Sequence, residues 1–366
     1  MKLVRPCLDQ LVAYEPGKSI ESLQKGERQK GAIKLASNEN AAGPSPRALK
    51  QIRESLATLH RYPDGNCLAL KKELASRLGV KESMVVVGNG SDEIILLALR
   101  AFVDPGEEVV VAEPTFLIYA LASKVAGAKV VPVPLRNLRY DLKGMREAVT
   151  EKTKIVFIAN PDNPTGTFVH RTEVGKFMED LPKHVLVFFD EAYHEFVEDK
   201  EYPDTRRYLN RHPVIITRSF SKAYGLAGLR IGYGMAPAEL VSAVDLVREP
   251  FNVNSLAQAA AIAALEDRAH LERTRHLVWE GKRYLCRKLD RLGLRYVPSQ
   301  TNFLLVYVGD AEAIYERLLS FGVIVREMGP WRLSGYLRVT IGTMSENRRF
   351  VHVLEKIMKE KESKRS

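Results

Sequence analysis

Cysteine is scarce in this 366-residue sequence, and its three copies are far apart. Cys7, Cys67 and Cys286 are odd in number and form no C-x-x-C pair. This pattern excludes a disulfide framework and a zinc site of the usual spacing. We therefore expect three reduced, unpaired thiols and no bound metal ion.

Long apolar runs are also missing from the sequence. No stretch approaches the roughly 18 uninterrupted apolar residues that a membrane span needs. The first ten residues lack the apolar segment of a secretory signal. There is no internal repeat and no low-complexity segment. We expect a cytoplasmic protein that does not associate with membranes.

The charge is unbalanced, since 55 basic and 45 acidic residues give a net charge of +10. Basic proteins can bind nucleic acid, but here the charge is spread along the chain and the only dense run is Lys356–Arg365. A solvated helix end explains that run better than an arm that binds nucleic acid. A positive field would also favour small anionic substrates.

What the sequence does contain is a regular alternation of strand and helix patterns. Amphipathic stretches such as Ser91–Phe102, Phe116–Ala126 and Thr172–Leu181 separate short apolar runs. This alternation predicts an α/β fold with a mainly parallel sheet between helices. The predicted strands are Met84–Val87, Glu108–Ala112, Lys129–Val133, Lys154–Ala159, Val185–Phe189, Val214–Arg218 and Arg230–Gly234. Two earlier helices are expected, one from Pro46 and one over Leu68–Leu78 that stops at Gly79.

The pattern changes after Ser255. One long helical stretch runs to about Leu292, and beyond it strands and helices no longer alternate one for one. The chain is also longer than the ~100–200 residues of a typical domain. We therefore expect an arm (1–30), a large domain (31–265) and a smaller α+β domain (266–366), divided inside the long helix. Packing of residues 31–45 against the small domain is left open. The strands expected in the small domain are Leu294–Val297, Phe303–Val308, Val323–Arg326 and Leu337–Ile341.

Polar residues gather directly after several predicted strands, where parallel sheets bind ligands. Gly88–Glu93 lies between a strand and an apolar helix, so the start of that helix could attract a phosphate group. Ser91 is equally suited to cap the helix. Asn160–Gly166 combines two prolines and a glycine in rigid turns. Each of these groups alone also fits a purely structural role.

Charged residues follow two further strands. Asp190 ends an apolar run, and a buried carboxylate there is costly unless a partner pairs with it. Lys222 also follows a strand, and partial desolvation would lower its proton affinity and make it an amine nucleophile. The hydroxyls of Ser219 and Ser221 and the guanidinium of Arg230 could share one phosphate group.

The order and spacing of these groups resemble the fold-type I pyridoxal-phosphate aminotransferases. Asn160 precedes Asp190 by 30 residues, Asp190 precedes Lys222 by 32, and Lys222 precedes Arg230 by 8. The family pattern is Asn-Pro-x-Asn-Pro-Thr-Gly, then Asp-x-x-Tyr, then Ser-x-Ser-Lys with an arginine eight residues on. The ordered set is much more specific than any one piece, and the resemblance covers nearly the whole chain.

The resemblance implies pyridoxal 5′-phosphate as the cofactor and a role for each matching residue. Lys222 would carry the cofactor as a Schiff base, and Asp190 would pair with the pyridinium nitrogen. Asn160 and Tyr193 would donate to the ring hydroxyl, and Phe116 would stack on the ring. The residues that match the phosphate site are Gly90 (through its backbone alone), Ser91, Asp92, Ser219, Ser221 and Arg230.

Both ends of the chain resemble one branch of this family, the histidinol-phosphate aminotransferases. Residues 35–40 and 43–46 resemble the N-terminal signature, although Ala41 replaces a common proline. Residues 61–63 match an Arg-Tyr-Pro element whose tyrosine, here Tyr62, reaches the cofactor phosphate of the neighbouring subunit. The resemblance therefore implies a homodimer with shared active sites.

The same resemblance assigns a substrate site. Arg338 matches the arginine that binds the substrate anion, and Arg326 on the neighbouring strand suits a dianionic phosphate better than a lone carboxylate. Tyr14 and Asn38 are the other residues assigned to the substrate. The segment Met328–Ser334 carries no assignment.

We therefore expect reversible amino transfer between L-histidinol phosphate and 2-oxoglutarate, which gives imidazole acetol phosphate and L-glutamate in histidine biosynthesis. The main alternative is an aromatic amino-acid aminotransferase, which shares the Asn-Glu-Asn signature. A phosphothreonine decarboxylase relative fits that signature less well. The remote alternatives are a cofactor-binding regulator and a non-catalytic, basic nucleic-acid-binding protein.

Overall fold

The computed structural model describes residues 3–5, 7–8, 11, 17–18, 20 and 31–363. Its largest sheet has seven strands in the order β2-β8-β7-β6-β5-β3-β4. All neighbours are parallel except that β8 is antiparallel to β2 and β7. The strands are β2 (Val85–Gly88), β3 (Glu108–Glu113), β4 (Lys129–Pro134), β5 (Thr153–Ala159), β6 (Leu186–Asp190), β7 (Val214–Ser219) and β8 (Gly232–Met235). The predicted mainly parallel α/β fold is confirmed.

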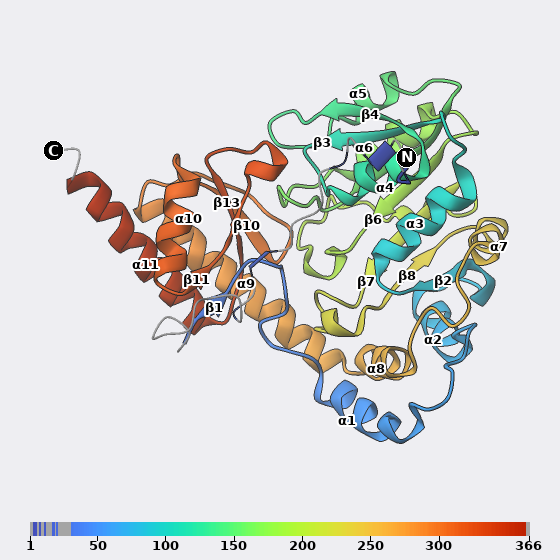
Figure 1. Cartoon of the computed structure of the whole chain (residues 1–366), viewed down its shortest axis with the longest axis horizontal. Coiled ribbons are helices and arrows are strands. Elements are labelled where there is room, and N and C mark those ends of the chain that lie inside the picture. Colours follow the sequence, from blue (N-terminus) through green and yellow to red (C-terminus); the bar gives the residue numbers. More distant parts are fainter. Residues whose placement is uncertain are drawn as a thin grey trace.

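Helices surround this sheet, and most of them occupy the predicted stretches (Figure 1). They are α1 (Pro46–Ser55), α2 (Leu68–Leu78), α3 (Ser91–Phe102), α4 (Ile118–Ala126), α5 (Leu142–Glu147), α6 (Arg171–Asp180), α7 (Ala238–Leu246) and α8 (Ser255–Glu266). α2 ends where expected, because Gly79 adopts the left-handed conformation at its C-cap. The strands β5, β6 and β7 are buried on both faces, so their apolar runs need no polar alternation.

The long helix predicted up to Leu292 is wrong, since the structure has two helices there. α8 ends at Glu266, and α9 (Arg268–Arg291) begins after Asp267. Asp267 accepts hydrogen bonds from the His270 amide (3.1 Å) and the Ser45 hydroxyl (2.6 Å), so it caps the second helix. α8 packs against α1, and α9 packs against the C-terminal helix α11 (Met344–Ser363). The predicted domain boundary at residues 265/266 lies next to this break and stays a prediction.

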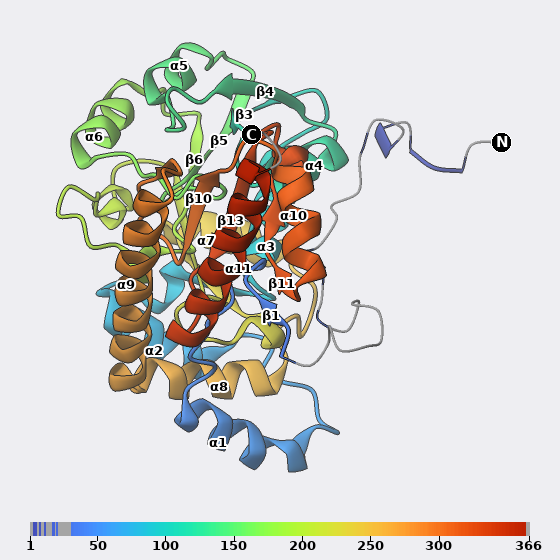
Figure 2. The same ribbon diagram turned by 90° about the vertical axis from the view of Figure 1, so that its left-hand side faces the viewer.

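The C-terminal region is built on a four-stranded antiparallel sheet in the order β12-β13-β10-β9. Its strands are β9 (Tyr296–Val297), β10 (Phe303–Tyr307), β12 (Arg326–Glu327) and β13 (Tyr336–Thr340). Figure 2 shows α9, α11 and α10 (Ala311–Ser320) side by side in this region. The single strand predicted over Val323–Arg326 is wrong. β11 (Val323–Ile324) instead pairs with β1 (Ile33–Lys34), and the chain then joins the other sheet as β12.

Two large groups of buried apolar side chains hold the molecule together. The first surrounds the seven-stranded sheet, and the second joins the C-terminal sheet and helices to Ile33 and Leu35 near the N-terminus. Short 3₁₀ turns complete the structure at Leu56–Thr58, Glu82–Met84, His194–Phe196, Thr205–Tyr208, Ala227–Leu229 and Gly329–Trp331. Within the described ranges no helix has the length and apolar character needed to cross a bilayer. The cytoplasmic location stays a prediction.

Candidate active site

A cavity of about 440 Å³ lies where β5, β6 and β7 end. The last residues of these strands, Ala159, Asp190 and Ser219, all line it. The N-terminal segment 36–39 and the arginines of β12 and β13 form another part of its wall. The cavity brings together most of the predicted site residues, namely Asn38, Ser91, Asp92, Phe116, Asp190, Tyr193, Ser219, Ser221, Lys222, Arg230, Arg326 and Arg338.

Lys222 follows β7 and directs its amine into this cavity. Its Nζ donates to the Ser37 carbonyl oxygen at 3.4 Å and lies 5.9 Å from the centroid of the Tyr193 ring. Burial, assisted by the positive charge of Arg338, lowers the pKa of Lys222 to about 8. A larger fraction of this amine is therefore neutral near physiological pH than for an exposed lysine.

Asp190 is the last residue of β6, whereas the sequence placed it just beyond the strand. Its backbone pairs with Ala159 on one side and Thr217 on the other, which fixes its position. The carboxylate accepts hydrogen bonds from the Tyr119 hydroxyl (2.7 Å) and the Ala192 amide (3.1 Å). Burial raises its pKa to about 6, and these two hydrogen bonds oppose that rise.

Asn160 and Tyr193, the predicted donors to a ring hydroxyl, differ in their present partners. Asn160 is fully buried, and its side-chain oxygen accepts from the Val169 amide at 3.0 Å. Its Nδ2 is a buried donor that meets no acceptor in the part of the chain that the structure describes. The Tyr193 hydroxyl accepts from Asn38 Nδ2 at 2.9 Å, and both residues line the cavity.

The start of α3 is open toward the cavity. Its N-cap is Gly90, with φ 82° and ψ 166°, and no side chain caps the helix. The suggestion that Ser91 caps the helix is therefore wrong, because Ser91 is the first helical residue. A Cβ on Gly90 would lie 2.7 Å from Arg230 Nη2, and one on Gly232 would lie 2.5 Å from the Ser91 nitrogen. Glycine is thus required for the close approach of Arg230 and β8 to the helix start.

The other side chains of this region lie close together. Arg230 pairs with Asp92 (3.4 Å), and the Ser219 hydroxyl oxygen accepts from the Ser221 amide (3.0 Å). Free N–H groups at a helix start, hydroxyls and a guanidinium are together the usual donors to a phosphate group.

Arg326 and Arg338 face each other as register partners on β12 and β13. Arg338 donates to Asn163 Oδ1 (2.5 Å) and to the Ala36 carbonyl oxygen (2.8 Å). The buried Trp331 ring lies 5.1 Å from the Arg326 guanidinium and 6.0 Å from that of Arg338. Two cationic groups are therefore held on one wall of the cavity.

Three residues near the site were missed by the sequence analysis. Tyr119 lies three positions after Phe116, and this helical spacing could have placed both residues on one face. Asn163 belongs to the motif that supplied Asn160, but only one asparagine was used. Trp331 lies in the segment without an assignment, where no motif pointed to it.

Three predicted residues in the described part of the chain do not line this cavity: Gly90 and Asn160, whose sequence neighbours Ser91, Ala159 and Pro161 line it, and Tyr62. Tyr62 is 82% exposed and stacks on Phe251, with ring centroids 4.7 Å apart, and it does not line the cavity. That position suits a residue that serves another subunit, which is the role the sequence suggested. Tyr14 lies outside the described residues.

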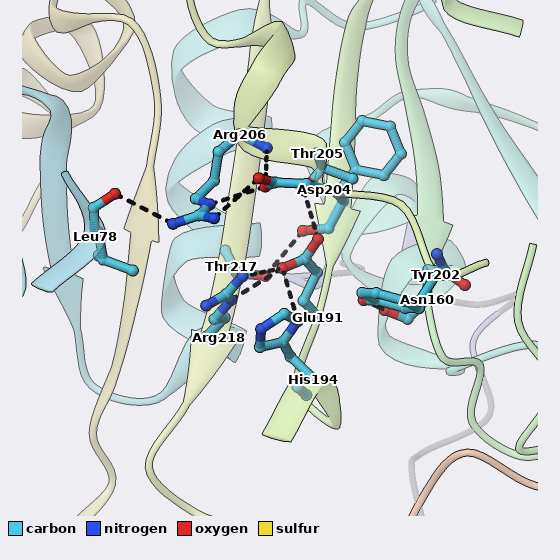
Figure 3. Close-up of polar contacts among 12 residues, drawn as sticks. Leu78, Asn160, Glu191, His194, Tyr202, Asp204, Thr205, Arg206, Thr217 and Arg218 are labelled. Carbon is cyan, nitrogen blue, oxygen red and sulfur yellow. Dashed lines mark hydrogen bonds and ion pairs between the residues drawn. The ribbon is translucent and has the colours of Figure 1, made fainter. Parts of the chain in front are cut away.

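A second polar cluster lies next to the ends of β6 and β7, and Figure 3 shows it around Glu191. The Glu191 carboxylate accepts from Arg218 Nε (2.9 Å) and Nη2 (2.8 Å) and from the Thr205 hydroxyl (2.5 Å). Glu191 and Arg218 are both buried. Glu191 directly follows Asp190, and Arg218 directly precedes Ser219. The ion pair therefore joins the two strand ends that line the cavity.

Comparison with known proteins agrees with this geometry. The model of the aminotransferase class I and II family matches residues 30–354. Histidinol-phosphate aminotransferase of Moorella thermoacetica is 47% identical over 348 residues, covering 94% of this chain and 90% of the relative. Histidinol-phosphate aminotransferase 1 of Nitrosococcus oceani is 46% identical over 352 residues, covering 96% of this chain and 95% of the relative.

A solved structure gives the same result. Histidinol-phosphate aminotransferase from Sinorhizobium meliloti, in complex with pyridoxal-5′-phosphate, superposes with a TM-score of 0.89 at 30% identity and covers 98% of both chains. The fold, the cavity and the family model together place this chain in the class I and II aminotransferases. Within that class, the chain belongs to the histidinol-phosphate aminotransferase family.

Proposed function

We propose that this protein transfers an amino group reversibly between L-histidinol phosphate and 2-oxoglutarate, with pyridoxal 5′-phosphate as its cofactor. The reaction gives imidazole acetol phosphate and L-glutamate and belongs to histidine biosynthesis. The observation that carries the proposal is the pair Arg326 and Arg338 on the wall of the cavity that contains Lys222. The names of the relatives support the substrate, and the cofactor bound by the Sinorhizobium meliloti protein supports the cofactor.

The residues that line the cavity and those beside it fit this cofactor. The buried Nδ2 of Asn160 lacks an acceptor among the described residues, and a ring hydroxyl would supply one. A Cβ on Gly232 would meet the Ser91 backbone nitrogen, and one on Gly90 would meet the Arg230 guanidinium. The two glycines therefore let the backbone of β8 and this cation approach the uncapped start of α3, where a phosphate group would bind. When bound, pyridoxal phosphate supplies an aldehyde carbon and a ring that accepts electrons from the substrate.

Each residue then has a role that follows from its chemistry. The neutral amine of Lys222 would hold the cofactor covalently at its aldehyde carbon, with loss of water, and as a free amine it would carry a proton to and from the substrate carbon. Asp190 holds a proton on the ring nitrogen by charge pairing. Phe116 stacks on the ring, and Asn160 and Tyr193 orient it at its hydroxyl. Ser91, Asp92, Ser219, Ser221 and Arg230 surround the phosphate group, together with the Gly90 backbone.

Arg326 distinguishes the phosphate substrate from an aromatic amino acid. Histidinol phosphate has no carboxylate, so its phosphate must provide the anionic group, and two arginines can share a dianion. Hydrogen bonds to charged groups contribute about 1.5–3 kcal/mol each. Arg326→Ala should therefore lower kcat/KM for histidinol phosphate roughly ten- to a hundredfold. It should affect phenylalanine or tyrosine much less.

The measurement is kcat/KM for both donors with wild type, Arg326→Ala and the control Arg317→Ala. Arg317 is a half-exposed arginine on α10 that pairs with Glu360 and does not line the cavity. An equal loss on both donors would assign Arg326 to the carboxylate site or to the fold. If the wild type used aromatic amino acids but not histidinol phosphate, the aromatic aminotransferase alternative would replace this proposal.

We also propose a homodimer in which Tyr62 serves the cavity of the partner subunit. Only Ala48 of α1 is buried, and Leu49 on the same helix lies exposed. Further exposed apolar side chains follow nearby in the sequence, at Leu56, Leu59, Tyr62 and Leu68. A group of exposed apolar side chains of this kind is typical of a protein interface. A second copy of the chain would cover it and bring Tyr62 to another cavity.

A further inference from the structure

Tyr119 connects two residues that the proposed function places around the cofactor ring. It lies in the first turn of α4, it is fully buried, and it lines the cavity. Its hydroxyl donates to Asp190 Oδ2 at 2.7 Å. Its ring meets Phe116 edge to face, with centroids 5.5 Å apart and an interplanar angle of 82°.

The position of Tyr119 is itself well fixed. Its ring stacks on Phe157 of β5, with centroids 4.8 Å apart and planes within 8°. Phe157 is fully buried in the central sheet, so its close-packed ring holds the Tyr119 ring in a fixed position. No other side chain in the described part of the molecule donates a hydrogen bond to the Asp190 carboxylate, whose second oxygen accepts from the Ala192 amide.

We propose that Tyr119 is a positioning residue for amino transfer. Its hydroxyl orients the Asp190 carboxylate and keeps it ionised, and its ring sets the angle of Phe116. Tyr119 acts through these two residues and takes no proton from the substrate. The inference rests on the proposed function, because it assigns Asp190 and Phe116 to the two sides of a bound ring.

The electrostatics support this role. A hydrogen bond to the charged form of an acid favours that form, and the bond from Tyr119 opposes the rise that burial causes in the pKa of Asp190. Burial and the nearby Asp190 charge raise the pKa of Tyr119 well above its ordinary value. The phenol therefore stays protonated and remains a donor at every pH at which Asp190 titrates. Without it, Asp190 would keep its own proton to higher pH and would stabilise a proton on the ring nitrogen less.

The first experiment uses Tyr119→Phe, which removes one oxygen atom and keeps both ring contacts. Carbon-13 NMR of labelled aspartate carboxyls gives the pKa of Asp190 in the cofactor-free protein, with Asp190→Asn to assign the signal. We expect this pKa to rise by about one or more. In the cofactor-loaded enzyme, kcat at neutral pH should fall roughly tenfold, and the acidic limb of its pH profile should move to higher pH.

Tyr140→Phe is the matched control. Tyr140 is also buried, but its hydroxyl contacts Thr115 (2.6 Å) and the Ala159 amide (3.2 Å) instead of Asp190. This variant should leave the pKa of Asp190 unchanged. An equal shift in both variants would assign the effect to a general change in the buried polar groups and would overturn the proposal.

A second variant keeps the test decisive if Tyr119→Phe does not fold. Site-specific 3-fluorotyrosine at position 119 has a more acidic hydroxyl, which is a stronger donor, and it should lower the pKa of Asp190. The proposal is overturned if the fluorinated protein, or a folded Tyr119→Phe protein, leaves this pKa unmoved. If the titrations behave as expected but the wild type shows no amino transfer, the proposed function is wrong. The effect of Tyr119 on the proton affinity of Asp190 is then still shown.

Discussion

Asp190 shows at the scale of one residue how burial and partners compete. Burial disfavours the carboxylate, and the two hydrogen bonds from Tyr119 and Ala192 compensate only in part, so its pKa is about 6. In the proposed function, the positive ring nitrogen would supply the missing compensation. The cofactor-free protein therefore carries an ionised carboxylate that its surroundings do not fully stabilise.

This imbalance predicts a pH-dependent effect of Asp190→Asn on the cofactor-free protein. The ordinary pKa is 3.8 and the folded value is about 6. The folded state thus holds the proton more tightly than the unfolded state. This tighter binding of the proton stabilises the folded state below pH 4, and the stabilisation is lost as the pH rises through about 6. Asp190→Asn should therefore increase the free energy of unfolding at pH 8 by roughly 1–3 kcal/mol, and much less at pH 4.

Urea unfolding of both cofactor-free proteins at the two pH values gives the comparison. A difference between variant and wild type that is the same at pH 4 and pH 8 would contradict the prediction. Such a result would mean that the substitution acts through packing and not through charge.

At the scale of elements, the ends of β6 and β7 are held by the Glu191–Arg218 ion pair (Figure 3). The negative charge of Glu191 raises the pKa of Arg218 above its ordinary value, against the effect of burial. A buried pair adds little net stability when formed, because both charges lose their hydration. Its contribution is to fix one strand against the other, and the neighbouring residues Asp190 and Ser219 line the cavity.

The pair should therefore be much more sensitive to loss of one partner than to loss of both. Arg218→Met leaves the Glu191 charge buried without its partner and should cost about 3–5 kcal/mol of unfolding free energy. Glu191→Gln combined with Arg218→Met should cost clearly less than the sum of the two single changes. Urea unfolding of the wild type and the three variants completes this double-mutant cycle. Additive costs would show that the two side chains do not depend on each other.

At the scale of the whole molecule, shared sites predict complementation between inactive chains. Tyr62→Ala and Lys222→Ala should each abolish most activity. A hybrid dimer of the two has one site with both an intact lysine and an intact tyrosine. Half of randomly mixed dimers are hybrids, so co-refolding equal amounts should restore about a quarter of the wild-type activity.

Light scattering gives the mass of the active species in the same samples. No recovery of activity in mixtures that do form dimers would remove Tyr62 from the partner's site. A monomer at working concentration would remove the shared site altogether.

Much of the fold and of the candidate site follows from local sequence patterns. The buried strands were predictable because runs such as that of β5 are apolar on both faces, and the cavity lies where their carboxyl ends meet. Lys222, Asp190 and Arg230 were found by their order and spacing. The division between β11 and β12 was not predictable, because it depends on pairing with β1, which is distant in the sequence. The break at Asp267 follows from a local helix cap, since its side chain accepts from the His270 amide, and the sequence analysis overlooked this cap.

The sequence by itself determined the class of protein, because motif order and strand periodicity are properties of the chain alone. Only the tertiary structure decided which side chains surround Asp190 and the two arginines. Tyr119 reaches Asp190 across 71 positions, and Asn163 reaches Arg338 across 175. Hydrogen bonds between residues so far apart in the sequence form only after the strands and helices have packed together. The identity of the reacting groups could therefore be predicted from the sequence. The surroundings that adjust their proton affinities could not.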